Sequence, residues 1–475
     1  KFNWQINVTI VSIVIITLVT KKFVRVRIDK KTRLVATLIL VIFSWISFSN
    51  LYMNKDVYQS IQNFDLINRW AQTQSYISKG FIYPFIHSLT SAFDQKPANY
   101  SESLAIEILD DYENDNIPKD KKVDIFAVML EGYNDFSTFE EVKFLIDVYK
   151  PWHNLMKESV SGELVNNIFA GETVDTEWGF LTGFSNFHQF RTMTNSYVHY
   201  LSDQGYIVEG SHPCYQWFYN RENINNYLGF DNYYFYENHY AKLANNTIAR
   251  DKILFPEIIN FYENSKQKNS PYFSFNVTYQ NHGPYPKTYT SETKYIEDDG
   301  LSTESYNILN NYLAGIYDTN KEVDKFIDYF RDKEATVIIL FGDHNPWLGD
   351  NNKVYHELGI NIDLDTEEGF FNYYNTPYLI WSNDKAKEVL ENDFIGQGET
   401  IGPYFLMNEL FNLAGYEGNS FMKLSNEIKH FTNIIHRDGY FLVDNNLVRE
   451  LDEEANKALE RFLIAQYYLR NNFLE

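Results

Sequence analysis

One apolar run, Thr336 to Phe341, passes through a glycine directly into a carboxylate and an imidazole, Asp343 and His344. Its length and its β-branched residues predict a buried strand. Parallel sheets place ligand sites at the carboxyl ends of their strands, and an Asp beside a His at such an end offers two metal ligands. The alternative is that the Asp343 side chain only caps the following loop. We therefore expect a sheet with a metal site at its edge.

Strand-like and helix-like segments alternate from Val123 onward, which indicates an α/β domain with a mostly parallel sheet sandwiched by helices. Strands are expected at 124–130, 206–209, 272–278, 336–341 and 377–381, and helices at 140–159, 193–203, 251–266, 306–330 and 401–414. Farther on, 431–435 and 440–443 predict a hairpin and 452–469 predicts an acidic amphipathic helix. These last elements are expected to form a small C-terminal α+β subdomain.

Two uncharged apolar stretches, Trp4 to Thr20 and Leu34 to Met53, open the chain. Because about 20 apolar residues span a bilayer and about 17 is the lower limit, both are expected to be transmembrane helices. The alternative is a buried helical hairpin of a soluble protein. Seven Lys and Arg residues lie between the stretches, and a short basic loop of this kind stays in the cytoplasm. The chain after Met53 is then expected on the extracytoplasmic face of a multi-pass protein.

Four parts follow from these patterns. Residues 1–53 are expected to be transmembrane segments, and the Lys at position 1 predicts that they are a fragment of a longer anchor. Residues 54–122 are expected to hold juxtamembrane helices and an acidic linker, with 101–120 as a solvated segment. Residues 123–430 would form the catalytic domain and 431–475 the C-terminal subdomain.

The composition of the 475 residues excludes several functions. A hydrophobic content of 44% and an aromatic content of 17% predict a packed core. A formal net charge of −23 argues against nucleic acid as a partner. The single cysteine, Cys214, allows no internal disulfide and no Cys-based zinc site. It is followed by Tyr-Gln-Trp-Phe, which does not fit the formylglycine motif of sulfatases.

Glu131 and Thr173 stand in two further polar clusters. Glu131 ends the predicted strand 124–130, and the following Gly132 would let another group approach the backbone closely. A carboxylate that merely emerges into solvent is an equal alternative. Thr173 lies in Gly-Glu-Thr-Val-Asp-Thr-Glu, where a Thr caps a helix. The same position exposes its hydroxyl beside backbone N–H groups that can receive an anion, and a metal ion would make the hydroxyl a nucleophile.

Arg221 and His282 supply groups that phosphate chemistry uses. Arg221 follows Tyr219 and Asn220 in a loop-like region, and its guanidinium could bind a phosphate through two N–H groups. A surface ion pair is the alternative for Arg221. His282 lies in an Asn-His-Gly-Pro turn after the strand 272–278, where a lone histidine is usually structural.

In their order along the chain, these segments resemble the lipoteichoic acid synthase family of phosphoglycerol transferases, within the alkaline phosphatase and sulfatase superfamily. The resemblance rests on Glu131, Gly171 to Glu177, Leu181-Thr182-Gly183, Tyr219-Asn220-Arg221, Asn281-His282-Gly283-Pro284 and Gly342-Asp343-His344. It covers roughly Val123 to Asp384 and the membrane anchor. Two departures bear on the substrate: Gly132 stands where many members have Ser, and Tyr219 where the synthases commonly have Trp.

The resemblance implies an alkaline phosphatase/sulfatase-like fold with a one-metal site. Glu131, Thr173, Asp343 and His344 would bind one divalent ion, Mn or Mg, with Zn as a further candidate. Thr173 would attack the phosphorus of phosphatidylglycerol, release diacylglycerol and carry the glycerol phosphate.

The resemblance also implies the substrate contacts. Tyr219, Asn220 and Arg221 would bind the substrate, and His282 would contact it and serve as general acid or base. The acceptor would be a cell-envelope glycopolymer or glycerol phosphate itself, and the lipid bilayer would hold the donor. Two alternatives stay open: a hydrolase of phosphate or sulfate esters with the same fold, and a non-catalytic membrane protein that retains the fold.

Overall fold

The computed structural model describes residues 29–52, 54, 57–58, 76, 78–92, 96–186, 190–266, 270–298 and 300–474. The chain forms two compact units, Lys1–Gln95 and Lys96–Glu475. The expected boundaries after 122 and 430 fall inside the larger unit, where they stay predictions. The expected span from Trp4 to Thr20 lies outside the described residues.

In the smaller unit, the second apolar stretch forms α2 (Lys30–Ser47), which continues into the π-helical turn η1 (Phe48–Tyr52). Residues Lys30–Asn50 are long and apolar enough to cross a membrane. Leu34, Phe43 and Trp45 are each more than 60% exposed, so the described residues do not bury this helix in a core. That exposure favours a membrane segment over the buried hairpin. The described part of the unit also holds α5 (Ile82–Ala92).

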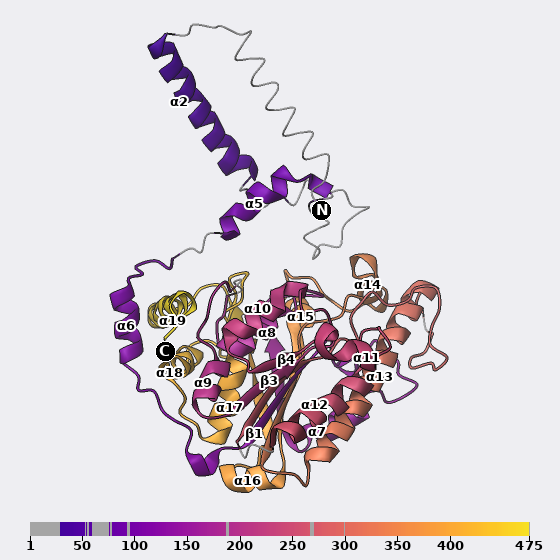
Figure 1. The fold of residues 1–475 in the computed structure, drawn as a ribbon. Coiled ribbons are helices and arrows are strands. Elements are labelled where there is room, and N and C mark those ends of the chain that lie inside the picture. Colours follow the sequence, from indigo (N-terminus) through magenta and orange to yellow (C-terminus); the bar gives the residue numbers. More distant parts are fainter. Residues whose placement is uncertain are drawn as a thin grey trace. The chain divides into compact units, whose positions relative to one another are not determined.

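The larger unit is built on one eight-stranded sheet in the order β4-β3-β5-β1-β6-β7-β2-β8 (Figure 1). Its strands are β1 (Asp124–Leu130), β2 (Ser159–Val165), β3 (Ile207–Ser211), β4 (Asn232–Tyr234), β5 (Tyr272–Val277), β6 (Thr336–Gly342), β7 (Asn375–Ser382) and β8 (Gly396–Ile401). Among these strands only β7 runs against its neighbours. The predicted mostly parallel sheet is confirmed.

Helices cover both faces of the sheet. The β1 residues Ile125, Ala127 and Met129 point into one core, and the alternating Phe126 and Val128 point into the other, as the two-residue period of a doubly covered strand requires. The first core is closed by α6 (Glu102–Asp110), α8 (Val174–Thr182), α9 (Tyr197–Asp203), α10 (Arg221–Leu228), α17 (Leu406–Ala414), α18 (Ser420–Lys429) and α19 (Glu453–Asn471). The second is closed by α7 (Lys150–Met156), α12 (Asp251–Ser265), α13 (Thr303–Phe330) and α14 (Lys353–Leu358).

Three expected elements differ from those of the structure. Of the helix expected at 140–159, only the short α7 forms, and Ser159 begins β2. This strand pairs with β7 and β8. Its polar sequence, Ser-Val-Ser-Gly-Glu-Leu-Val, does not show the apolar pattern of a central strand. The helix expected at 401–414 begins at Leu406, because the chain up to Ile401 pairs as β8 and Pro403 follows. The hairpin is shifted along the chain, to β9 (Phe441–Val443) and β10 (Asn446–Val448).

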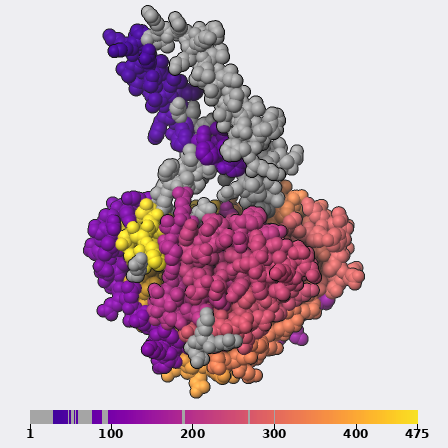
Figure 2. Space-filling view, viewed as in Figure 1, coloured from indigo at the N-terminus to yellow at the C-terminus, as the bar shows by residue number. Residues whose placement is uncertain are grey.

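The acidic segment 101–120 is not a solvated linker throughout. It contains α6, which buries Ala105, Ile108 and Leu109, a spacing that gives the helix one apolar face. Figure 2 shows α6 (violet) beside α19 (yellow) at one side of the larger unit. The many acidic residues of this segment led to the prediction of a solvated linker, although its apolar residues have helical spacing.

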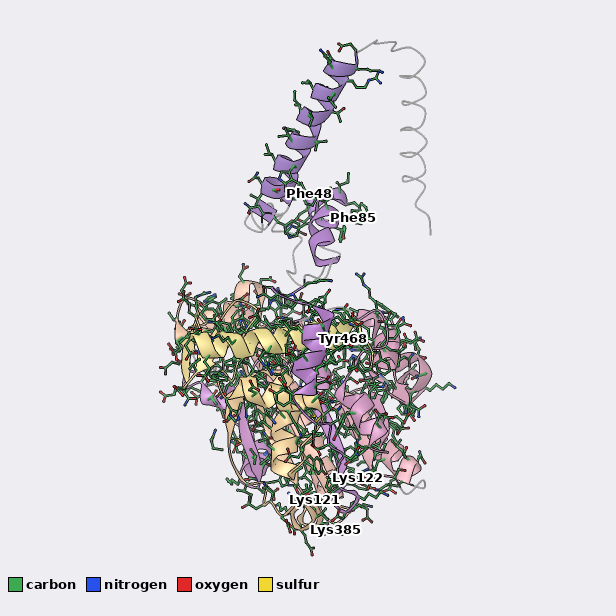
Figure 3. The ribbon with its side chains drawn as sticks, turned by 90° about the vertical axis from the view of Figure 1, so that its left-hand side faces the viewer. Phe48, Phe85, Lys121, Lys122, Lys385 and Tyr468 are labelled. Carbon is green, nitrogen blue, oxygen red and sulfur yellow. The ribbon has the colours of Figure 1, made fainter. Side chains whose placement is uncertain are left out.

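The polarity of the sheet places the two ends of the larger unit. Lys121 and Lys122 precede β1, and Lys385 lies in α16 (Asp384–Leu390) directly after the reversed strand β7. Figure 3 shows these three lysines together at one end, which is therefore the amino edge of the parallel strands. The carboxyl edge, where ligand sites form, lies at the other end of the sheet.

Candidate active site

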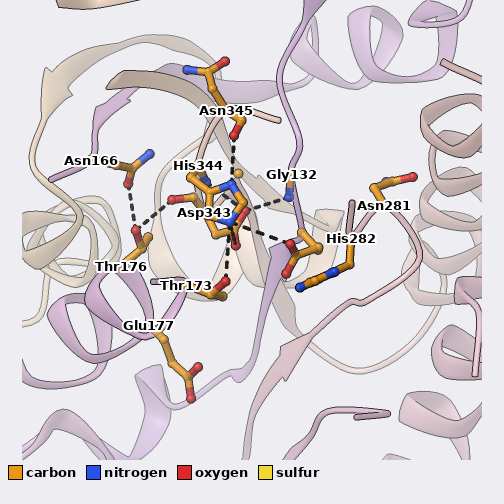
Figure 4. A network of polar contacts seen from close by, with 12 residues as sticks. Gly132, Asn166, Thr173, Thr176, Glu177, Asn281, His282, Asp343, His344 and Asn345 are labelled. Atoms are coloured by element: carbon orange, nitrogen blue, oxygen red, sulfur yellow. Dashed lines mark hydrogen bonds and ion pairs between the residues drawn. The ribbon is translucent and has the colours of Figure 1, made fainter. Parts of the chain in front are cut away.

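Four side chains converge beyond the carboxyl ends of β1 and β6 (Figure 4). The two strands pair in register from Asp124 opposite Thr336 to Leu130 opposite Gly342, so the residues that follow them meet. His344 Nε2 lies 3.2 Å from Asp343 Oδ2 and 3.7 Å from Glu131 Oε1. The same nitrogen lies 3.5 Å from Thr173 Oγ1. All four residues are buried.

Backbone N–H groups bond to only one of the two carboxylate oxygens of Asp343. Its Oδ1 accepts the N–H groups of Gly132 and His344, both at 2.8 Å. Gly132 has a φ of +57°, and a Cβ there would lie 3.3 Å from the Asn281 carbonyl oxygen, so the close approach expected of this glycine is present. The other oxygen of Asp343, Oδ2, is buried without a hydrogen-bond partner and faces the cluster.

A strained loop presents Thr173 at the start of α8. Ala170 and Glu172 have φ values of 56° and 59°, and such a left-handed conformation costs about 1–3 kcal/mol for residues with a side chain. The Thr173 hydroxyl makes no capping hydrogen bond to α8. Its nearest polar partner is His344, so capping does not account for this threonine.

Acceptor atoms dominate the cluster. His344 Nδ1 bonds to the Asn345 carbonyl oxygen at 3.0 Å. Because a carbonyl only accepts, Nδ1 carries a proton, and Nε2 is the ring nitrogen that faces the cluster. Burial, and next the charge of Asp343, raise the pKa of Glu131 to about 8. Two carboxylate oxygens, a hydroxyl oxygen and a ring nitrogen thus face one another, and one of these oxygens, Asp343 Oδ2, has no hydrogen-bond partner. The donor set fits a divalent cation bound by oxygen and imidazole, and Glu131, Asp343 and His344 lie close enough to hold one.

Arg221 is buried, not a surface residue. Its Nε and Nη2 both donate to Glu177 Oε2, at 3.0 and 2.8 Å, and both side chains are at most 2% exposed. The expected alternative of a surface ion pair is therefore wrong, although the arginine is paired. Glu177 fixes one side of the guanidinium fork, which leaves Nη1 and the remaining Nη2 hydrogen for a ligand.

Tyr219 and Asn220 precede Arg221 in a strained turn. Both have left-handed backbone, with φ values of 55° and 59°, and the Tyr219 ring lies under the guanidinium, 5.4 Å from Arg221 Cζ. The Asn220 amide oxygen accepts from Asn223 Nδ2 at 2.6 Å. The turn thus places an aromatic ring and an amide next to the arginine.

His282 lies beside the cluster in Figure 4. Its Nδ1 donates to the Gly283 carbonyl oxygen at 2.7 Å, and its ring stacks on Tyr279 with centroids 4.7 Å apart. Packing around the ring lowers the pKa of His282, and the charge of Asp343 opposes that shift. Nε2 remains available for a substrate proton.

A buried network supports the turn that carries His282. Asn281 Nδ2 donates to Thr319 Oγ1 at 3.0 Å, and Thr319 Oγ1 donates to Asp251 Oδ2 at 2.6 Å. Burial raises the pKa of Asp251 to about 7. The network ties the turn to α12 and α13.

His212 is a further buried residue near the site that the sequence patterns did not single out. It directly follows β3, is buried, and bonds through Nδ1 to the Val277 carbonyl oxygen at 3.1 Å. Burial, followed by the charges of Arg221 and His282, holds its pKa well below the usual range. Its place at a strand end was the available signal, the same signal that singled out His344.

Comparisons with known proteins agree on one family. The sulfatase family model matches residues 125–416. A protein of Rhizobium meliloti named for cyclic beta-1,2-glucan modification is 28% identical over 403 residues, which are 79% of this chain and 58% of that protein. The lipoteichoic acid synthase of Staphylococcus saprophyticus is 23% identical over 250 residues, which are 50% of this chain and 36% of the synthase.

A solved structure shares the fold. The phosphoglycerol transferase GacH of Streptococcus pyogenes, solved with sn-glycerol-1-phosphate, superposes with a TM-score of 0.61 and 18% sequence identity. The match covers 78% of this chain and 94% of that one. The chain spans little more than half of the Rhizobium relative and about a third of the synthase.

Proposed function

Because the chain belongs to the sulfatase family, as the resemblance predicted, we propose that it is a metal-dependent phosphoglycerol transferase. It would move glycerol phosphate from phosphatidylglycerol to a cell-envelope glycopolymer. The observation that carries this proposal is the Thr173 hydroxyl, which is turned away from its own helix and toward three metal-ligand side chains. The relatives named for phosphoglycerol transfer and lipoteichoic acid synthesis support glycerol phosphate as the group transferred.

The cluster would hold one divalent ion, Mn or Mg, with Zn also compatible with its oxygen and imidazole donors. That ion would lower the pKa of the Thr173 hydroxyl and offset negative charge on the phosphate. Glu131, Asp343 and His344 would be its ligands together with Thr173. A dication bound there would keep Glu131 and Asp343 deprotonated and neutralise their two charges.

In the first step, the Thr173 oxygen forms a bond to phosphorus and the bond from phosphorus to the diacylglycerol oxygen breaks. The hydroxyl proton leaves to solvent, and His282 gives a proton to the departing oxygen. A bound phosphodiester adds negative charge beside His282, which favours its protonated form. Arg221 binds the phosphate oxygens, since Glu177 leaves one side of its fork open.

In the second step, an acceptor hydroxyl attacks the glycerophosphoryl group, the bond from phosphorus to the Thr173 oxygen breaks, and that oxygen regains its proton from solvent. His282 takes the acceptor proton and is ready for the next cycle. Both steps need in-line geometry and a compensated phosphate charge, which are the demands of phosphoryl transfer.

A membrane location belongs to the same proposal. The apolar helix α2 follows a basic segment, so the domain after it would lie on the extracytoplasmic face. There it would meet its lipid donor in the bilayer.

The test is diacylglycerol release from phosphatidylglycerol vesicles by the full chain in the presence of Mn²⁺. Thr173→Ala should abolish release, whereas Thr173→Ser, which keeps a hydroxyl, should retain part of it. Full activity of Thr173→Ala would overturn the proposal. So would turnover of aryl sulfates without any release of diacylglycerol, because that result assigns the chain to the ester hydrolases.

A further inference from the structure

A row of aromatic rings leads from the surface to the buried Arg221. Trp217 is 66% exposed and stacks on Tyr215, with centroids 5.6 Å apart and planes 21° apart. The row continues from Trp217 to Phe218 at 5.8 Å and from Phe218 to Tyr219 at 4.4 Å. Tyr219 then lies against the guanidinium. We call these four residues, Tyr215, Trp217, Phe218 and Tyr219, the aromatic row.

The backbone fixes the inner end of this row. Tyr219 and Asn220 are consecutive left-handed residues, and strain of this kind persists where the surrounding structure requires it. The turn connects the exposed Trp217 to the buried start of α10 within four residues. The aromatic row is therefore continuous with the candidate active site and is not an isolated surface patch.

The surroundings of Trp217 are polar and acidic. The N–H of Gln216 donates to Glu237 Oε2 at 2.9 Å, and the N–H of Glu222 donates to the Gln216 carbonyl oxygen at 3.1 Å. Glu222, Asn223, Glu237 and Asn238 are exposed. No lysine occurs between 212 and 241, and the one arginine there is Arg221.

The acidic and polar surroundings of Trp217 favour some classes of ligand over others. A surface of anionic lipid attracts lysines and arginines and disfavours carboxylates, and a polymer of glycerol phosphate carries the same negative charge. A neutral sugar chain meets no such repulsion. The apolar face of a pyranose ring packs on an exposed aromatic ring, and its hydroxyls bond to carboxylates and amides at the edge.

We propose that the aromatic row is the acceptor subsite and that the acceptor is a neutral chain of pyranose sugars, which stacks on Trp217 and Tyr215. This rests on the proposed transfer function, since it names the acceptor of that reaction. Tyr219 would then lie at the junction, between the acceptor hydroxyl and the phosphate held by Arg221.

The test uses the full chain with two soluble probes, linear β-1,2-linked glucose oligosaccharides and glycerol phosphate oligomers. Binding of each probe is measured by calorimetry, and transfer is followed as the apparent KM for the glucose probe. Trp217→Ala should weaken glucose-oligomer binding and raise that KM at least about 10-fold, which corresponds to about 1.4 kcal/mol of binding free energy. Trp217→Phe should recover most of the loss because it keeps a flat ring.

Tyr289→Ala is the matched control. Tyr289 is 65% exposed, its ring belongs to no part of the aromatic row, and its substitution should leave both readouts as in the wild type. The proposal is overturned if Trp217→Ala binds the glucose oligomers as the wild type does, or if the wild type prefers the glycerol phosphate oligomers. Loss of binding to phosphatidylglycerol vesicles in Trp217→Ala, with sugar binding intact, would also overturn it in favour of membrane docking.

The two proposals can fail separately. Calorimetric binding of the glucose oligomers needs no turnover, so a chain that binds them through Trp217 but releases no diacylglycerol refutes the transferase and leaves the sugar site standing. A chain that releases diacylglycerol but binds no sugar refutes the sugar site alone.

Discussion

Two groups of buried charges lie in the candidate active site, and they differ in how their charge is balanced. Glu177 and Arg221 neutralise each other through two hydrogen bonds to one oxygen. Among the described residues, Glu131 and Asp343 form no ion pair with a lysine or an arginine, and the imidazole Nε2 of His344 faces them instead. Since isolated buried charges are very unfavourable, the opposite charges of the first group balance each other as the chain folds, although Glu177 Oε1 has no hydrogen-bond partner. The two carboxylates of the second group can both be charged only when a cation is bound.

The difference separates two tasks. The paired group positions an arginine that can contact a substrate without ever being charged alone in the core. The unpaired group places two carboxyl groups side by side, and a metal ion would compensate their negative charge. The first two predictions below each remove charge from one group and leave the other intact; the last two concern carboxyl and arginine groups outside both.

The largest effect is expected on metal binding. Asp343→Asn removes the carboxylate oxygen that has no partner, and Mn²⁺ affinity of the full chain should fall more than about 100-fold, since residues that merely orient ligands already contribute 10–100-fold. Titration calorimetry with Mn²⁺ measures it. Glu163→Gln is the matched control, because burial also raises the pKa of that carboxyl, to about 7, yet it lies outside the cluster. Equal affinity in Asp343→Asn and wild type would show that the cluster is not the metal site.

Breaking the paired group should cost folding stability. Glu177→Gln leaves the buried Arg221 charge uncompensated and should lower the free energy of unfolding by about 3 kcal/mol or more. Denaturant titration of the full chain in detergent checks this. Adding Arg221→Met should restore much of the loss, because a buried ion pair can be replaced by apolar groups at little cost. A double variant no more stable than Glu177→Gln would contradict the pairing.

A third buried carboxyl, Asp251, tests the same electrostatics through pH. Its folded pKa is raised to about 7, above the unfolded value, so the unfolded chain releases its proton first as pH rises. Stability should therefore fall between about pH 4 and 7 and then level off. Asp251→Asn should remove that part of the decrease, and the nearby Arg250, Asp318 and Glu322 stay unchanged. The comparison is made at saturating Mn²⁺, and a parallel decrease in both proteins would contradict the assignment.

The smallest effect is expected at Arg437. Its Nη1 lies 3.1 Å from Glu172 Oε2, and both side chains are about half exposed. Exposed ion pairs contribute at most about 1 kcal/mol, so Arg437→Ala should change unfolding stability by about 1 kcal/mol or less. A loss as large as that of Glu177→Gln would mean that exposure does not separate these pairs.

Polar residues directly after predicted strands were the most informative feature of the sequence. It singled out Glu131, Asp343 and His344, which the register of β1 and β6 brings together. It did not reveal β2, whose pairing with β7 and β8 involves residues more than 200 positions away. Nor did it reveal that Arg221 is buried, because its partner Glu177 lies on a different helix.

His212 and the aromatic row show a second limit. A histidine after a short strand and a run of aromatic residues have ordinary structural explanations along the sequence. Only the structure shows that His212 is buried and that the rings from Tyr215 to Tyr219 form one continuous path. The left-handed backbone at Tyr219 and Asn220 is likewise a property of the fold that the local sequence did not predict.

The central claim is that Thr173 carries the glycerophosphoryl group in a site completed by a divalent cation. Peptide mass spectrometry after brief incubation of the full chain with phosphatidylglycerol and Mn²⁺ tests it most directly. The account predicts a single added glycerophosphoryl group on Thr173, absent without metal and absent in Asp343→Asn. Diacylglycerol release with no modified Thr173, or with the group on another residue, would contradict it.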